Sequence, residues 1–259
     1  MPVITWWGHA TTTVQDSGVR VLTDPVFANR VAHLRRRRGP VPGPDAAVAD
    51  LVVISHLHSD HLHLPSLAAL KPGTTVLLPA GAVASVPGLR RLRRLDLVEV
   101  VAGDEVAVGL VRVRAVPASH DGRRWPVGGR RVEALGYVVT GAGITYFAGD
   151  TDLFPEMSAE VGRCDVALLP VGGWGPNLGE GHLDPGRAAV ALARLSAAAA
   201  VPIHYGTFCP FGLGLRPGSW FHRPGREFAA RAAVAAPSAV VHELFPGRSA
   251  ALTSRPARP

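Results

Sequence analysis

Short runs of apolar residues, separated by turn-forming residues, recur along the whole chain. The runs are short enough to be strands, and few are long enough to form an amphipathic helix. We expect strands at residues 2–7, 11–14, 19–23, 49–54, 75–78, 97–101, 105–108, 111–116, 135–140, 144–147, 165–170, 199–203 and 240–245. The pattern therefore predicts a protein built mainly from β-sheet, with a few helices between the strands.

The expected strand at residues 111–116 has apolar and basic side chains at alternate positions. Val111, Val113 and Ala115 alternate with Arg112 and Arg114. Such alternation is typical of an antiparallel sheet with one exposed face. We therefore expect the strands from residue 97 to residue 147 to form one antiparallel run.

Helical segments are fewer than strands. Asp184 followed by Pro185 is typical of a helix start, because Asp is a good N-cap and proline suits the first helical position. We expect that helix to end near Ser196. Residues 26–45, rich in Arg, Pro and Gly, are expected to form a long loop that acts as a lid or a substrate wall. Other helices are expected at residues 65–70, within 80–95 and at 226–235.

The composition is that of a globular protein, with 47% hydrophobic and 18% charged residues. A chain of 259 residues can form one large domain, and we expect it at residues 1–252, with a flexible tail at residues 253–259. The first ten residues lack the pattern of a signal peptide, and no apolar run approaches the roughly 20 residues of a membrane span. Cys164 and Cys209 lack the spacing of a redox or zinc pair, which favours free thiols in a reducing compartment. We expect a cytoplasmic protein without a transmembrane segment.

The net charge of +7 at pH 7 changes the expected partners. Arginines cluster at residues 35–38, 90–94 and 123–131, and a basic surface attracts phosphate-bearing substrates or anionic lipid. The alternative interpretation is a compositional bias that leaves these arginines merely solvated. The clusters also lack the interleaved aromatic residues that single-strand binders use for stacking. We therefore expect an anionic substrate and no obligate nucleic acid.

A cluster of potential metal ligands directly follows the apolar run at residues 51–54. His56, His58, Asp60 and His61 lie within six residues of one another. Side chains two positions apart in an extended segment share a face, so His56 and His58 can point to one ion. Asp60 and His61 lie just beyond and can face a second ion. Zinc is the expected metal, and iron or manganese accepts the same ligands. A histidine-rich surface loop is the alternative, but a buried strand leading into the cluster argues against it.

Three further candidate ligands, His120, Asp150 and His204, each follow an expected apolar strand. The ends of strands in a layered sheet converge on one crevice, so these side chains can join the cluster. The resulting set has one ion between three histidines, a second ion beside a carboxylate and two histidines, and a carboxylate that bridges them. In that order its members are His56, His58 and His120, then Asp60, His61 and His204, and finally Asp150.

These residues resemble a known family. HLHSDH at residues 56–61 matches the HxHxDH motif of the metallo-β-lactamase superfamily. The chain most resembles the branch that contains N-acyl-phosphatidylethanolamine phospholipase D and ascorbate-6-phosphate lactonase. Supporting segments are WGHAT at 7–11, LTDPVF at 22–27, AGDT at 148–151, GHLDP at 181–185 and HYGTF at 204–208. His63, where an acidic residue is common, and Tyr205, where the phospholipase-like relatives usually have Trp, depart from the pattern outside the ligand positions.

The resemblance implies an α/β (α+β) fold, namely a four-layer αββα sandwich with a dinuclear metal site at one edge. The hypothesis that follows is hydrolysis of an ester, with a phosphodiester as the expected bond and a small or lipid-like anionic compound as the expected substrate. Two zinc ions can hold a bridging hydroxide, because metal binding lowers the pKa of water to about 7. Asp60 would ligate one ion and orient that hydroxide, and Mn²⁺ or Fe²⁺ could replace zinc.

Other activities fit parts of the same pattern. One is a lactonase or carboxylic ester hydrolase that acts on a small phosphorylated substrate. Another is a nuclease or nucleic-acid-binding protein of the same fold, which the arginine clusters suggest. A third is a metal-binding or redox protein that performs no hydrolysis.

Three residues outside the ligand set are also candidates for function. His182 precedes the helix start at Asp184, and helix N-termini favour anions. We predict that His182 contacts the phosphate of the substrate or donates a proton to the leaving group, unless it only steadies its loop. His9 either orients a metal-bound carboxylate or is a buried polar residue. Asp24, before Pro25, is expected to cap a turn, and a hydrogen bond to a ligating histidine is the alternative.

Overall fold

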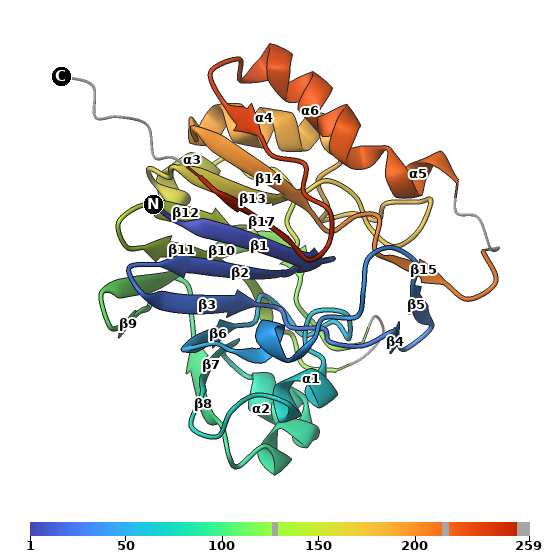
Figure 1. Cartoon of the computed structure of the whole chain (residues 1–259). Helices are drawn as coiled ribbons and strands as arrows, with labels where there is room; N and C mark the ends of the chain where they lie inside the picture. Colours follow the sequence, from blue (N-terminus) through green and yellow to red (C-terminus); the bar gives the residue numbers. More distant parts are fainter. Residues whose placement is uncertain (126–128, 214–217, 253–259) are drawn as a thin grey trace.

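The computed structural model of the chain describes residues 1–125, 129–213 and 218–252. Two seven-stranded sheets lie face to face at its centre (Figure 1). In spatial order the first sheet contains β17 (Arg248–Ala251), β1 (Val3–Gly8), β2 (Thr11–Asp16), β3 (Val19–Thr23), β6 (Leu51–Val53), β7 (Thr75–Pro79) and β8 (Asp96–Val100). Strands β3, β6, β7 and β8 run parallel, and the other neighbours are antiparallel.

The second sheet also mixes parallel and antiparallel strands. In spatial order it contains β16 (Val240–Val241), β14 (Ala199–Ile203), β13 (Val166–Pro170), β12 (Ile144–Phe147), β11 (Glu133–Thr140), β10 (Val111–Asp121) and β9 (Glu105–Val108). Strands β12, β13, β14 and β16 are parallel, and β9 to β12 are antiparallel. Both sheets thus contain a parallel half, whose strands all end at one edge.

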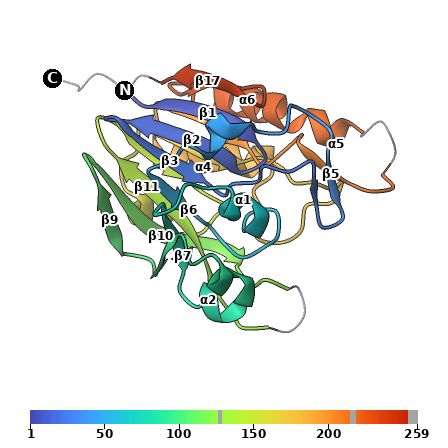
Figure 2. The same ribbon diagram turned by 60° about the horizontal axis from the view of Figure 1, so that its bottom comes forward.

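Helices cover the outer faces of both sheets and complete a four-layer αββα sandwich (Figure 2). The α-helices are α1 (Leu64–Ala68), α2 (Ala82–Ser85), α3 (Met157–Val161), α4 (Pro185–Leu195), α5 (Ser219–His222) and α6 (Pro224–Ala235), and the 3₁₀ helices are η1 (Pro44–Ala47) and η2 (Pro87–Arg91). As the sequence predicts, the side chain of Asp184 caps α4 by accepting a hydrogen bond of 2.8 Å from the amide of Arg187. None of the described helices is long and apolar enough to cross a membrane.

The core explains why the central strands read as continuous apolar runs. Leu51 and Val53 of β6 point into the core between the sheets, where they meet residues of the second sheet such as Tyr137. Val52 points the other way, into a cluster with Leu67 of α1. Because each strand of this kind is covered on both faces, no polar alternation remains in its sequence.

The structure corrects several sequence-based expectations. The strand expected at 97–101 is β8, which pairs in parallel with β7 in the first sheet instead of joining the antiparallel run. The expected loop at residues 26–45 contains a hairpin of β4 (Arg30–Val31) and β5 (Leu34–Arg36), which pairs with β15 (Phe208–Pro210) as a third sheet. The final strand is β17, paired with β1, whereas the expected strand at 240–245 shrinks to β16. The expected tail at residues 253–259 lies outside the described residues.

Candidate metal centre

The candidate ligands meet at the edge of the sandwich where strands of both sheets end. His56 to His61 follow β6 of the first sheet, whereas Asp150 follows β12 and His204 follows β14 of the second. His120 lies inside β10, not after it, because the strand extends to Asp121. All seven predicted ligands are therefore brought together, although they come from four separate segments.

Three histidines form a first group, which we call the outer triad: His56, His58 and His120. The Nδ1 atom of His58 lies 2.8 Å from Nε2 of His56 and 3.3 Å from Nε2 of His120. Two nitrogens bound tetrahedrally to one zinc ion are separated by about 3.3 Å, given a Zn–N bond of about 2.05 Å. The outer triad thus has the spacing of ligands that share an ion. His58 and His120 are half-buried, and His56 is buried.

The second group, which we call the inner triad, contains Asp60, His61 and His204, and all three are buried. The Nε2 atoms of His61 and His204 lie 3.1 Å apart. One carboxylate oxygen of Asp60 lies 3.9 Å from Nε2 of His61. The inner triad therefore offers two nitrogens and one oxygen to a common point.

Asp150 lies between the two triads. Its carboxylate oxygens lie 3.3 Å from Nε2 of His61, 3.2 Å from Nε2 of His204 and 4.0 Å from Nε2 of His56. The buried Oδ1 atom accepts no hydrogen bond from any of the described residues. A buried carboxylate oxygen without a hydrogen-bond donor requires another positive partner, and a metal ion supplies one.

Hydrogen bonds orient three of the rings so that their Nε2 atoms face the centre. Nδ1 of His61 donates to Asp24 at 2.7 Å, and Nδ1 of His120 and of His204 each donate to a backbone carbonyl at 2.9 Å. Those carbonyls belong to Gly181 and Gly172 respectively. A proton fixed on Nδ1 leaves the lone pair of Nε2 free for a metal, as is usual for ligating histidines.

Asp24 does not simply cap a turn, as the sequence suggested. Its fully buried carboxylate accepts hydrogen bonds from the amide of Ser55 at 2.7 Å, from the hydroxyl of Ser55 at 2.5 Å and from His61. The same hydroxyl lies 3.0 Å from Nδ1 of His56. Asp24 thereby supports one ring of each triad. It directly follows β3, the parallel neighbour of β6, and this adjacency is the signal that the sequence offered.

The contact between His9 and Asp60 decides between the two interpretations of His9. Nε2 of His9 lies 2.8 Å from the carboxylate of Asp60. Burial alone would raise the pKa of Asp60, but the hydrogen bond from His9 and the neighbouring His61 hold it well below its usual range. His9 therefore keeps a carboxylate of the inner triad ionised and in place, and it is not a merely buried polar residue.

Burial and neighbouring carboxylates together decide the charge of the histidines. It lowers the pKa of His58 to about 4 and lowers the pKa values of His56 and His204 well below the usual range. These rings are neutral at pH 7, which is the form that binds metal. For His61, burial acts in the same direction but is outweighed by Asp150 and Asp24, which raise its pKa. The carboxylates thus favour positive charge at the inner triad.

His182 lies beside this cluster. Its Nδ1 atom is 3.1 Å from the carbonyl oxygen of Gly179 and 3.0 Å from that of Glu180, so this nitrogen carries a proton. Nε2 lies 3.4 Å from Asp150. Burial alone would lower the pKa of His182, but the hydrogen bond and charge of Asp150 outweigh it and raise the pKa to about 9. The ring also packs edge-on against His120.

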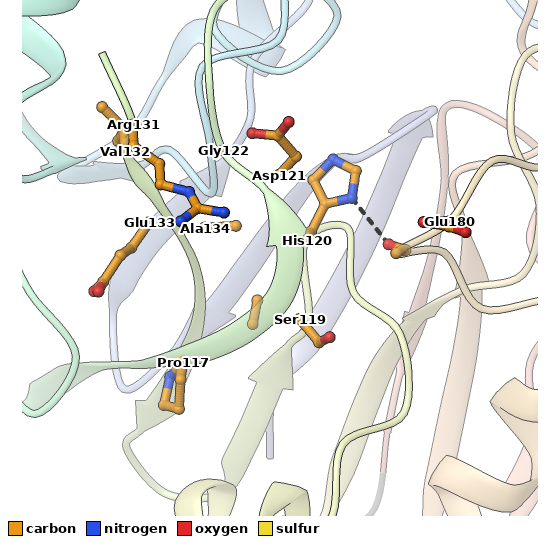
Figure 3. Close-up of a pocket in the computed structure, with 12 residues that line it drawn as sticks. Pro117, Ser119, His120, Asp121, Gly122, Arg131, Val132, Glu133, Ala134 and Glu180 are labelled. Atoms are coloured by element: carbon orange, nitrogen blue, oxygen red, sulfur yellow. Dashed lines mark hydrogen bonds between the residues drawn. The ribbon is translucent and has the colours of Figure 1, made fainter. Parts of the chain in front are cut away.

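A cavity of about 660 Å³ lies beside the outer triad. The register between β10 and β11 shifts between Pro117 and Asp121, and this bulge turns His120 toward His58. Figure 3 shows His120 pointing to the loop that carries Glu180, with its hydrogen bond drawn. Arg131 lines the cavity together with acidic residues, so its wall is polar and carries both charges.

Four large aromatic side chains differ in their exposure to solvent. Trp6 and Phe208 are buried, and Phe208 packs edge-on against His9. Trp125 and Trp174 are exposed by 62% and 37%. Only the second pair can contact a molecule that approaches from solvent.

A four-layer αββα sandwich with a histidine and aspartate cluster at one edge defines the metallo-β-lactamase class of proteins. The family model of the β-lactamase superfamily domain matches residues 19–205, and the chain belongs to this superfamily. The matched residues include all seven candidate ligands and Asp24, whereas His9 precedes the match.

Known relatives agree with this assignment. A UPF0173 metal-dependent hydrolase of Aeropyrum pernix is 32% identical over 223 residues, which cover 80% of this chain and 84% of that protein. A protein of the same description from Nitratidesulfovibrio vulgaris is 33% identical over 214 residues, covering 79% of this chain and 80% of that protein. The solved structure of a possible metal-dependent hydrolase from Veillonella parvula has a TM-score of 0.74 at 15% identity, covering 97% and 100% of the two chains. That likeness shows the fold.

Proposed function

We propose that this protein is a metal-dependent hydrolase that binds two zinc ions and cleaves an ester bond, with a phosphodiester as the preferred substrate. Two lines of support exist. The chain is 32% identical to a relative described as a metal-dependent hydrolase. Its own cluster combines neutral imidazoles with ionised carboxylates, which is the donor set that zinc prefers.

The single observation that carries the proposal is the position of Asp150 between two triads. The outer triad would hold one ion and the inner triad the other, and Asp150 would contact both. Imidazole nitrogens lie 2.8 to 3.3 Å apart within the triads. This spacing is close to the roughly 3.3 Å that separates two nitrogens bound tetrahedrally to one zinc ion, and it therefore supports ions shared within the triads.

The ions would supply the nucleophile by lowering the pKa of water and would polarise the bond that is cleaved. Asp60, held by His9, would accept a hydrogen bond from the attacking water and orient it. His182 holds one proton on Nδ1, and its raised pKa of about 9 keeps a second proton on Nε2, which faces Asp150 and the centre. We propose that it donates a proton to the leaving group or binds the substrate's phosphate.

The substrate class follows from charge and space. A net charge of +7 favours an anionic substrate, either small or lipid-like. The polar cavity beside His120 is large enough for a substituent of such a molecule. We further propose that the chain falls in the branch of phospholipase D-like and lactonase-like members, because the segments at residues 22–27 and 204–208 match that branch.

The test combines metal analysis with a substrate screen. The purified protein should contain about two zinc ions per chain, as a site with two sets of ligands requires. A chromogenic phosphodiester, a lactone and a carboxylic ester are then compared side by side, before and after treatment with a chelator. We expect the phosphodiester to be cleaved fastest, with activity lost on chelation and restored by zinc. Activity that resists the chelator would contradict the metal-dependent mechanism. Faster cleavage of the lactone than of the phosphodiester would contradict the proposed substrate.

A further inference from the structure

The segment that follows His120 packs against the turn that carries the HxHxDH motif. The carbonyl of Gly122 accepts a hydrogen bond of 3.1 Å from the amide of Leu57. Two residues further on, Nη1 of Arg124 lies 2.9 Å from the carbonyl oxygen of Leu57 and 2.9 Å from that of Leu62. A single guanidinium nitrogen, which carries two protons, thus donates one hydrogen bond to each carbonyl.

These two carbonyls bracket residues 58–61 of the metal motif. Leu57 precedes His58, and Leu62 follows His61, while both leucine side chains are fully buried in the cluster between β6 and α1. Inside the turn, the carbonyl of His58 accepts hydrogen bonds from the amides of His61 and Leu62. The turn is therefore closed from within by His58 and from outside by Arg124.

The charge of Arg124 also lies close to the site. Burial lowers the pKa of its guanidinium, while the carboxylate of Asp60 acts in the opposite direction. Arg124 in turn contributes, after burial, to the lowered pKa of His63. A charged group that is partly withdrawn from water and that donates to backbone carbonyls forms stronger hydrogen bonds than a neutral one. The cost of burying it is thus offset at this turn.

We propose that Arg124 is a positioning residue that fixes the turn carrying His58, Asp60 and His61, so that metal affinity depends on it. The inference rests on the proposed function, because it concerns how that site is held. Arg124 belongs to the same segment as His120, which comes from the second sheet, whereas the turn belongs to the first sheet. Its two hydrogen bonds therefore tie together the parts of the site that the two sheets supply.

The test compares Arg124→Gln and Arg124→Lys with a matched control. Arg112 lies on the same strand as His120, but its side chain is 69% exposed and its ion pair with Glu105 measures 3.6 Å. Arg112→Gln therefore removes the same charge without touching the turn. Zinc affinity is measured by competition with a chromogenic chelator, and the melting temperature is measured on the metal-free proteins. Activity is measured separately as kcat and KM on the best substrate from the screen.

We expect Arg124→Gln to weaken zinc binding about 10- to 100-fold, as is typical for residues that support ligands, and to lower kcat more than it changes KM. Arg124→Lys should recover part of the affinity, because one ammonium group can donate to both carbonyls. Arg112→Gln should match the unmodified protein. If Arg124→Gln fails to fold, the zinc affinity of Arg124→Lys is the test. A zinc affinity weaker than that of Arg112→Gln would support the proposal.

Two results would overturn the inference. One is unchanged zinc affinity in Arg124→Gln at a lowered melting temperature, which would make Arg124 a stabilising residue only. The other is unchanged zinc affinity with a raised KM, which would place Arg124 in contact with the substrate. Failure of the unmodified protein to bind zinc would instead overturn the proposed function, and this inference with it.

Discussion

The two triads of the candidate site differ in how they are enclosed. The inner triad is buried, and it is supported from outside by the side chains of Asp24 and His9. The outer triad has two half-buried members, and His120 is oriented by the backbone carbonyl of Gly181. The inner triad thus depends on polar side chains of the core. The outer triad depends on them only at His56, through the hydroxyl of Ser55, and at His120 it depends on a loop.

Under the proposed function, this difference predicts different roles for the two ions. A buried subsite with two carboxylates nearby should hold its ion tightly, because the ion replaces positive charge that these carboxylates already favour. A half-exposed subsite beside a cavity can exchange a water for a substrate atom, as catalytic zinc sites require. We therefore expect the inner ion to be retained and the outer ion to meet the substrate.

The largest effect should come from removing the residue that the two triads share. Asp150→Ala should lose both ions and reduce turnover more than about 100-fold, since even residues that only support ligands cost 10- to 100-fold. Metal content per chain and kcat are the measurements. Glu105→Gln, a carboxylate on the exposed strand β9, is the control and should retain both. Retention of one ion by Asp150→Ala would show that the triads do not share a ligand.

The next effect should separate the triads. His58→Ala removes a member of the outer triad only, so we expect about one ion to remain per chain while turnover is lost. His222→Ala, an exposed histidine on α5, should keep both ions. Metal analysis after dialysis distinguishes these cases. Loss of both ions from His58→Ala would mean that the two subsites do not bind their ions independently.

The sequence predicted local features of this site well. The run before His56 and the motif itself lie in one short segment, so the strand, the turn and the candidate ligands could be inferred together. The α4 helix was predicted for the same reason, because Asp184 and Pro185 mark its start within two residues. The fold class followed from resemblance to a known family, and the paired sheets and outer helices confirm it.

Features that depend on distant parts of the chain were either left open between alternatives or missed. For Asp24 a turn cap was expected and a hydrogen bond to a histidine of the cluster was the alternative, and its carboxylate contacts His61, 37 residues away. His9 contacts Asp60 across 51 residues, and β17 pairs with β1 across nearly the whole chain. Local sequence patterns do not encode such pairings, because the partner is chosen by the packing of the sheets. Strand β8 was placed in the wrong sheet for the same reason.

A smaller effect should follow from weakening the support of the inner triad. In Asp24→Asn the amide cannot accept all three hydrogen bonds, so we expect zinc affinity to fall about 10- to 100-fold and stability to fall by about 1–3 kcal/mol. Asp16→Asn is the matched control, because this buried carboxylate accepts from the amides of Ala142 and Gly143 far from the ligands. Asp16→Asn should lower the melting temperature and leave the zinc affinity unchanged. Equal zinc affinity in both variants would show that Asp24 is structural.

The smallest effect should come from disturbing the loop that supports the outer triad. Gly181 has a φ of +75°, and an added Cβ would lie 3.0 Å from Nδ1 of His120. Gly73 has a φ of +79°, and no heavy atom lies within 4 Å of its added Cβ. Both Gly→Ala variants should cost about 1–2 kcal/mol from the left-handed backbone, because L-residues are strained there. Only Gly181→Ala should also weaken the outer ion, by about tenfold, since it displaces the ring that Gly181 orients. Stepwise removal of zinc with a chelator, at one temperature below both melting points, measures this difference. Identical zinc release from the two variants would show that the carbonyl of Gly181 does not support the outer triad.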